Sequence, residues 1–160
     1  MLIDIIAGAR PNFIKISPII DVLENLSLKH VSYRFIHTGQ HYDENMSGAF
    51  IEQLGIPKPF VNFEVESGTH AEQTAKIMVC YEQLLIKELS DICIVVGDVN
   101  STMACAIVAK KMCVKVAHVE GGIRSGDLSM PEEINRIVTD SIADFFFVTT
   151  DSAVKNLEKT

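Results

Sequence analysis

Short apolar runs alternate with longer stretches of helical periodicity along almost all of this 160-residue chain. A weaker extended stretch near 60–64 follows a loop that contains Pro57 and Pro59. Strands that alternate with helices form βαβ crossovers, and these require a parallel sheet. The sequence therefore predicts one doubly wound α/β domain over residues 1–160. Strands are expected at 2–7, 32–38, 92–97, 114–119 and 145–149, and helices at 14–26, about 44–54, 70–89, 101–112, 132–142 and 152–159.

The composition narrows the choice of partners and compartment. Apolar residues make up 48% of the chain and the mean hydropathy is +0.22, which suits a sheet covered on both faces, or a domain that buries one face against a neighbour. The net charge of −7 argues against nucleic acid or an anionic membrane as a partner. Four cysteines without CxxC spacing, and no signal peptide, favour reduced thiols and a cytoplasmic protein.

The residues that best indicate chemistry follow the predicted strands. His118–Asp127 reads HVEGGIRSGD, and PEEINR follows at 131–136. Asp98 ends the strand over 92–97, so Asp98, Glu120 and Glu132 are expected to converge at one edge of the sheet. Crowded carboxyl groups can divide the roles of acid and base between them. Arg124 and Arg136 are expected to balance the negative charge.

The first strand ends in GARPNFIK, over residues 8–15. Gly8 permits a tight turn, and Asn12 is expected to cap the helix that follows. Arg10 and Lys15 add positive charge at that helix N-terminus, which favours a phosphate or diphosphate; an ordinary turn with two solvated cations fits the spacing equally well. Neither GxGxxG nor a Walker loop is present, so NAD and ATP lack their usual sequence support.

The histidines and the nearest hydroxyl group give weaker signals. His41 follows Thr38-Gly39-Gln40 and is either a ligand contact or an ordinary loop histidine. His118 lies within a predicted strand, so we expect a buried histidine whose nitrogens have partners. Ser125 lacks the GxSxG context of a nucleophile elbow. The chain shows no metal-ligand spacing, so no metal site is expected.

Taken together and in order, five segments resemble the UDP-N-acetylglucosamine 2-epimerase family. Members of this family resemble glycosyltransferase-B proteins, with two Rossmann-like halves and a cleft between them. The resemblance implies that this chain is the N-terminal domain and that a C-terminal UDP-binding domain, in cis or in trans, completes the cleft. The segments are GARPNFIK (8–15), TGQH (38–41), GDVNST (97–102), HVEGGIRSGD (118–127) and PEEINR (131–136).

The resemblance also implies a reaction, which is inversion of C2 in UDP-GlcNAc to give UDP-ManNAc for surface polysaccharide precursors. UDP is eliminated, 2-acetamidoglucal forms, and UDP adds again after protonation on the opposite face. Neither a metal nor a nicotinamide cofactor is implied. Matched by motif, the acid/base carboxylates are Asp98, Glu120 and Glu132, and the substrate-binding residues are Arg10, Lys15, Gln40, His41 and Arg136.

Several alternatives stay open at the level of sequence. A hydrolysing relative would release ManNAc and UDP, and another member would act on a modified UDP-GlcNAc derivative. The 160 residues alone are expected to be inactive, and a non-catalytic remnant is a further alternative. Bacterial members have an allosteric site with two glutamines; Gln40 matches the first, whereas Asp43 stands at the second. A homodimer is compatible with the resemblance.

Overall fold

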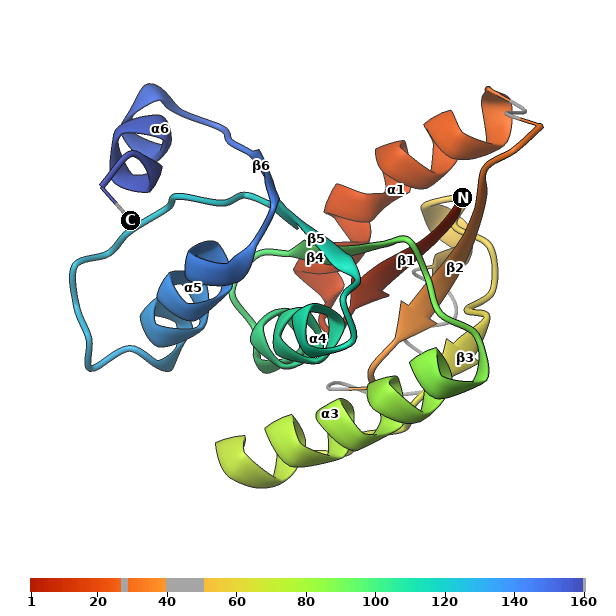
Figure 1. Ribbon diagram of the computed structural model, residues 1–160, viewed down its shortest axis with the longest axis horizontal. Coiled ribbons are helices and arrows are strands. Elements are labelled where there is room, and N and C mark those ends of the chain that lie inside the picture. The colour runs from red at the N-terminus through yellow and green to blue at the C-terminus, as the bar shows by residue number, and fades with distance from the viewer. Residues whose placement is uncertain (27–28, 40–50, 160) are drawn as a thin grey trace.

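The structure is a computed structural model that describes residues 1–26, 29–39 and 51–159. These residues form a six-stranded, wholly parallel sheet in the order β3-β2-β1-β4-β5-β6 (Figure 1). The strand order reverses next to β1, as in a doubly wound fold. The predicted α/β class is therefore confirmed. The strands are β1 (Leu2–Ala7), β2 (Ser32–His37), β3 (Val61–Asn62), β4 (Ile92–Val96), β5 (Lys115–Val119) and β6 (Phe145–Phe147), and the helices are α1 (Arg10–Asn25), α3 (His70–Lys87), α4 (Asn100–Lys111), α5 (Pro131–Ile142) and α6 (Asp151–Leu157).

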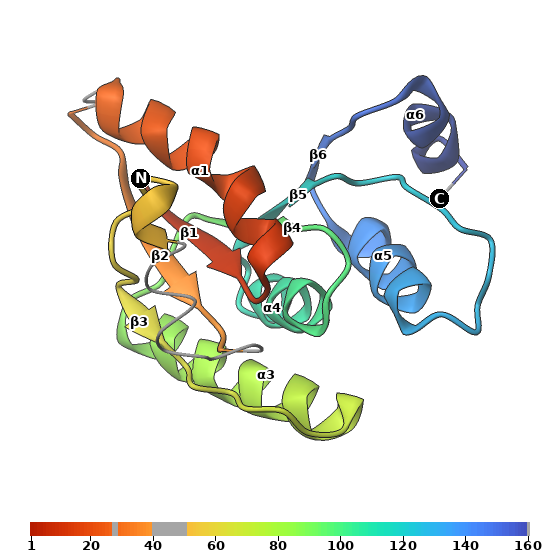
Figure 2. The same cartoon turned by 180° about the vertical axis from the view of Figure 1, so that it is seen from behind.

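Helices cover both faces of the sheet, with α1 on one side and α3 and α4 on the other (Figures 1 and 2). Successive strand residues point to opposite faces. Ile5 accordingly belongs to the core that contains Phe13 of α1, whereas Ile6 belongs to the core that contains Tyr81 of α3 and Ala104 of α4. The sheet therefore has an apolar core on each of its faces.

Helix α1 begins earlier than the sequence predicts, at Arg10 instead of residue 14. Asn12 was expected to precede the helix as its cap, but it lies in the first turn and Ala9 is the N-cap residue. The Asn12 carboxamide nevertheless caps the helix from inside, because its Oδ1 accepts a hydrogen bond from the Ala9 amide at 2.9 Å. Pro11 fits this first turn because its fixed φ is helical and its missing N–H is not needed there.

Helix α4 also differs from expectation at its start. The N-cap residue is Val99, which makes no side-chain cap, and Asn100 is already helical. Asn100 and Ser101, whose side chains suit a cap position, thus lie inside the helix and not at its N-cap. Of the helix expected at about 44–54, residues 51–53 are helical and 44–50 lie outside the described residues.

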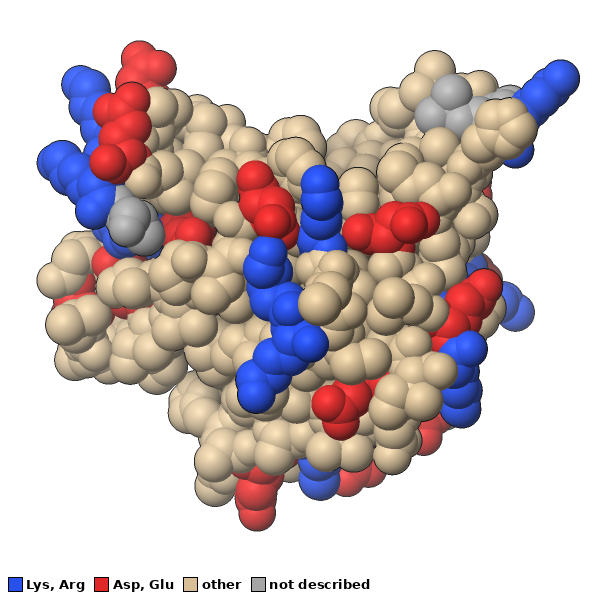
Figure 3. Space-filling view, viewed as in Figure 1, with Lys and Arg blue, Asp and Glu red and all other residues tan. Residues whose placement is uncertain are grey.

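The surface mixes both signs of charge. On the face shown in Figure 3, basic and acidic side chains are interspersed among large uncharged areas, and the molecule is hollowed between its α6 side and its α1 side. An apolar cavity of about 470 Å³ lies between α1 and the strands β4, β5 and β6. Among the described residues, we find no helix with both the length and the apolar character needed to cross a membrane.

Candidate functional site

The three carboxylates predicted to act together lie around the carboxyl ends of β4 and β5. Asp98 follows Gly97, whose φ is +69°, and Glu120 follows β5 with its own φ at +69°. A positive φ is uncommon for a residue with a side chain, so the turn holds Glu120 in a conformation that few residues adopt. Glu132 lies in the first turn of α5. The fold therefore places the predicted acids at the edge of the sheet where sites are expected.

Arg136 of α5 joins Asp98 to the buried acid Glu133. Its Nε and Nη2 donate to Asp98 Oδ2 at 3.0 and 2.5 Å, and its Nη1 donates to Glu133 Oε2 at 2.6 Å. Charge-assisted, forked contacts of this kind have a fixed geometry. Arg136 therefore holds Asp98 against α5, the helix that also carries Glu132.

Glu133, the neighbour of Glu132 in the sequence, is buried and stabilises the fold. It is 1% exposed, and its carboxylate accepts hydrogen bonds from the amides of Ser125 and Gly126, both at 3.0 Å. Burial by itself raises the pKa of Glu133, but these amides and Arg136 lower it to about 2. Glu133 is therefore ionised over the working pH range and anchors the loop between β5 and α5.

Asp98 and Glu132 line the same small cavity, which has a volume of about 190 Å³. Asn135 is also in its lining, and its Nδ2 donates to the Asp98 carbonyl at 2.8 Å. The pair of carboxyl groups can supply both an acid and a base to a ligand placed between them. The remaining lining residues are His70, Gln73, Val99, Asn100 and Pro131.

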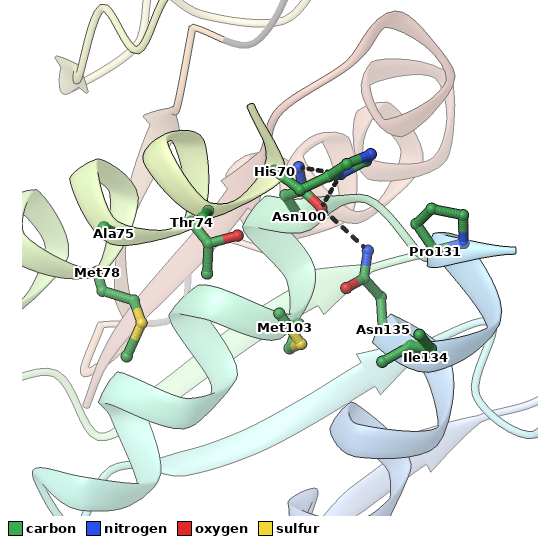
Figure 4. Close-up of a pocket in the computed structure, with 10 residues that line it drawn as sticks. His70, Thr74, Ala75, Met78, Asn100, Met103, Pro131, Ile134 and Asn135 are labelled. Carbon is green, nitrogen blue, oxygen red and sulfur yellow. Dashed lines mark hydrogen bonds between the residues drawn. The ribbon is translucent and has the colours of Figure 1, made fainter. Parts of the chain in front are cut away.

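A larger apolar cavity of about 420 Å³ adjoins the small one, because the two share four lining residues (Figure 4). Figure 4 shows His70 from α3 and Asn135 from α5 pointing toward Asn100 at the start of α4. The Asn100 carboxamide contacts His70 Nδ1, and its Oδ1 accepts a hydrogen bond from Asn135 Nδ2 at 3.3 Å. This polar cluster is part of the lining of both cavities. The shared residues are His70, Asn100, Pro131 and Asn135.

Glu120 lies outside the lining of the small cavity and pairs with Lys15 of α1. The pair sits beside Gly97: a Cβ atom at that position would be 3.7 Å from Lys15 Nζ and 3.8 Å from Glu120 Oε2. The three acids predicted to converge thus lie in two neighbouring groups. Asp98 and Glu132 share a cavity, and Glu120 lies next to the residue that precedes Asp98.

The other predicted binding residues have different positions. Arg10 is exposed at the first position of α1. Gln40 and His41 lie outside the described residues. Arg124, expected to balance the three acids, instead donates to Asp140 at 2.5 Å. Across residues 1–26, 29–39 and 51–159, no three His, Cys, Asp or Glu side chains are grouped as a metal ion would need.

His118 is buried with partners on both ring nitrogens, as predicted, but its partner Asp140 was not found from the sequence. Asp140 Oδ1 lies 2.7 Å from His118 Nδ1, and the Gly97 carbonyl oxygen lies 2.8 Å from His118 Nε2. Asp140 comes 22 residues after His118, so no local motif joins them. One signal was available: Asp140 and Glu133 are two helical turns apart and therefore share one face of α5.

Comparison with known proteins gives the family. A family model described as UDP-N-acetylglucosamine 2-epimerase matches residues 24–160. The chain is 48% identical to the UDP-N-acetylglucosamine 2-epimerase of Methanocaldococcus jannaschii over 157 residues, which cover 98% of this chain and 42% of that protein. It is 45% identical to the UDP-2,3-diacetamido-2,3-dideoxy-D-glucuronate 2-epimerase of Pseudomonas aeruginosa over 154 residues, 96% of this chain and 43% of that protein.

Solved structures agree. The crystal structure of M. jannaschii UDP-GlcNAc 2-epimerase in complex with UDP-GlcNAc and UDP superposes with a TM-score of 0.94 at 47% identity, covering 99% of this chain and 43% of that one. The putative enzyme from Listeria monocytogenes superposes with a TM-score of 0.90 at 29% identity, with 99% and 42% coverage. The chain thus spans less than half the length of these relatives. On this evidence, the chain belongs to the UDP-N-acetylglucosamine 2-epimerase family.

Proposed function

We propose that the protein containing this chain is a UDP-N-acetylglucosamine 2-epimerase that interconverts UDP-GlcNAc and UDP-ManNAc. The observation that carries the proposal is the cavity lined by both Asp98 and Glu132, because inversion at C2 requires a proton to be removed and another returned. Family membership supplies the substrate class, since the M. jannaschii relative was crystallised with UDP-GlcNAc and UDP.

In the proposed reaction, a carboxylate removes the C2 proton as UDP departs, and 2-acetamidoglucal is left bound. A second carboxyl group then protonates C2 from the other face, and UDP adds again to C1. Asp98, Glu132 and Glu120 are the candidates for these roles. Arg10, Lys15 and Arg136 supply positive charge near the departing diphosphate, and Gln40 and His41 are proposed substrate contacts.

The rest of the active site is proposed to come from a second, UDP-binding domain, supplied in cis or in trans. The chain spans 42% of the length of the M. jannaschii relative, so a cleft between two domains is consistent with the coverage. The net charge and the cysteine pattern fit a cytoplasmic enzyme that uses a soluble nucleotide sugar, and a homodimer fits the family.

A second substrate deserves a test because identity to the P. aeruginosa 2-epimerase, at 45%, is close to the 48% found for the M. jannaschii enzyme. That relative is named for a UDP-2,3-diacetamido-2,3-dideoxy-D-glucuronate. The chemistry at C2 would be the same, and the two substrates differ in the groups at C3 and C6.

The direct test is NMR analysis of products formed by the complete protein. We expect UDP-GlcNAc to yield UDP-ManNAc, and Asp98→Asn or Glu132→Gln to lower kcat by about 10²- to 10⁴-fold because an acid or base is removed. Glu82→Gln, on an exposed part of α3, is the matched control and should keep wild-type activity. Free ManNAc and UDP would identify the hydrolysing alternative. A folded protein that leaves both UDP-sugars unchanged would contradict the proposal.

A further inference from the structure

One buried side-chain pair ties together three segments at the candidate site. His118 is 0% exposed and contacts Asp140 of α5 on one side and the Gly97 carbonyl on the other. Asp140 Oδ2 in turn accepts hydrogen bonds from the Gly122 amide at 3.0 Å and from Arg124 Nη1 at 2.5 Å. The pair therefore joins the loop after β4, the turn after β5, and α5.

These three segments carry the three candidate carboxylates. Asp98 directly follows Gly97, Glu120 comes two residues before Gly122, and Glu132 lies in the first turn of the helix that contains Asp140. The turn after β5 packs closely against α6, because a Cβ atom at residue 122 would lie 2.4 Å from the Ala153 carbonyl oxygen. The pair is thus placed where it can fix the relative positions of all three acids.

The hydrogen bonds also define which atom of the ring donates to residue 97. A backbone carbonyl oxygen only accepts hydrogen bonds, so His118 Nε2 donates to the Gly97 carbonyl oxygen. Burial by itself raises the pKa of Asp140, but hydrogen bonds from His118 and Arg124 lower it overall. Asp140 therefore holds the ring from its other side, through Nδ1.

We propose that His118, held by Asp140, is a positioning residue that fixes the Gly97 carbonyl and hence Asp98. Through Asp140 the same unit fixes the turn that follows Glu120. This inference rests on the function proposed above. His118 is not in the lining of the small cavity that Asp98 and Glu132 share, so it acts through Gly97 and not on the substrate.

Two substitutions of His118 each keep one of the two contacts of its ring and remove the other. An asparagine amide reaches about as far as Nδ1, so His118→Asn keeps the contact with Asp140 and loses the one with Gly97. A glutamine amide reaches about as far as Nε2, so His118→Gln keeps the Gly97 contact. We expect His118→Asn to lower kcat on the order of 10²-fold with KM nearly unchanged, since misplacing a reacting group by about 1 Å costs that much. His118→Gln should lose clearly less.

A merely structural role predicts a different pattern. Both variants would then melt at lower temperature, and kcat per folded molecule would stay at the wild-type value in each. That result, or equal losses of kcat in the two variants, would overturn the proposal.

A second measurement uses no substrate and does not depend on an active variant. In the complete protein labelled with ¹⁵N-histidine, the His118 resonances, assigned by their loss in His118→Gln, should show a proton on Nε2 that is hydrogen-bonded to the Gly97 carbonyl oxygen. A His118 ring whose Nε2 carries no proton would overturn the proposal. A protonated Nε2 in a protein that acts on no UDP-sugar would count against the proposed function and leave the contact between His118 and Gly97 established.

Discussion

At the start of α5, two neighbouring acids have opposite surroundings. Glu133 is buried among backbone amides, whereas Glu132 faces a cavity beside Asp98. The local sequence placed both in a first helical turn, where any acid is favourable, and only the family resemblance singled out Glu132. It did predict the strand-end position of Asp98 and the burial of His118. The contact between Lys15 and Glu120 spans 105 positions and exists only after the chain has folded.

Glu133→Gln should lower the free energy of unfolding by about 2 kcal/mol at neutral pH, because a buried amide cannot replace the carboxylate in all three contacts. The folded pKa of Glu133, about 2, lies below its ordinary 4.5, so this contribution is complete above pH 4.5 and is lost as the pH falls toward 2. Urea unfolding at pH 7 and pH 3 measures it. Glu132→Gln is the control and should change stability by less than about 0.5 kcal/mol. Equal effects of the two substitutions would contradict the assignment.

At the scale of elements, the sequence predicts the type and order of strands and helices better than their ends. The strands are apolar runs with clear limits, and all five expected runs appear in the sheet. The start of α1 was missed because Asn12 has a role that involves another element. Its Nδ2 donates to the Val96 carbonyl at the end of β4, 84 positions away, while its Oδ1 caps α1.

Asn12→Ala should therefore destabilise the protein by about 2 kcal/mol, since it leaves the buried amides of Gly8 and Ala9 and the Val96 carbonyl without their side-chain partner. Thermal and urea unfolding measure the effect. Asn25→Ala, at the exposed end of the same helix, removes only a surface contact with Asp21 and should cost less than about 0.5 kcal/mol. Similar losses for both variants would show that Asn12 does not join the two elements.

At the scale of the whole molecule, the described residues form a doubly wound sheet that carries Asp98, Glu120 and Glu132 near its carboxyl edge. The chain spans 42% of the length of its M. jannaschii relative. The order of five motifs was enough to predict the family, because the motifs fall at the strand ends and helix starts that build this edge. The positions of the side chains at this edge depend on contacts between strands and helices that are far apart in the sequence. The motifs do not specify these contacts.

In the proposed reaction, carboxyl groups of this chain exchange the C2 hydrogen of a UDP-sugar with solvent. This exchange can be followed by NMR of the product that the complete protein forms from UDP-GlcNAc in deuterated water. We predict deuterium at C2 of every UDP-ManNAc molecule formed, and its gradual appearance in the remaining UDP-GlcNAc. UDP-ManNAc that keeps its original C2 hydrogen would contradict the account, because inversion would then proceed without an acid and a base.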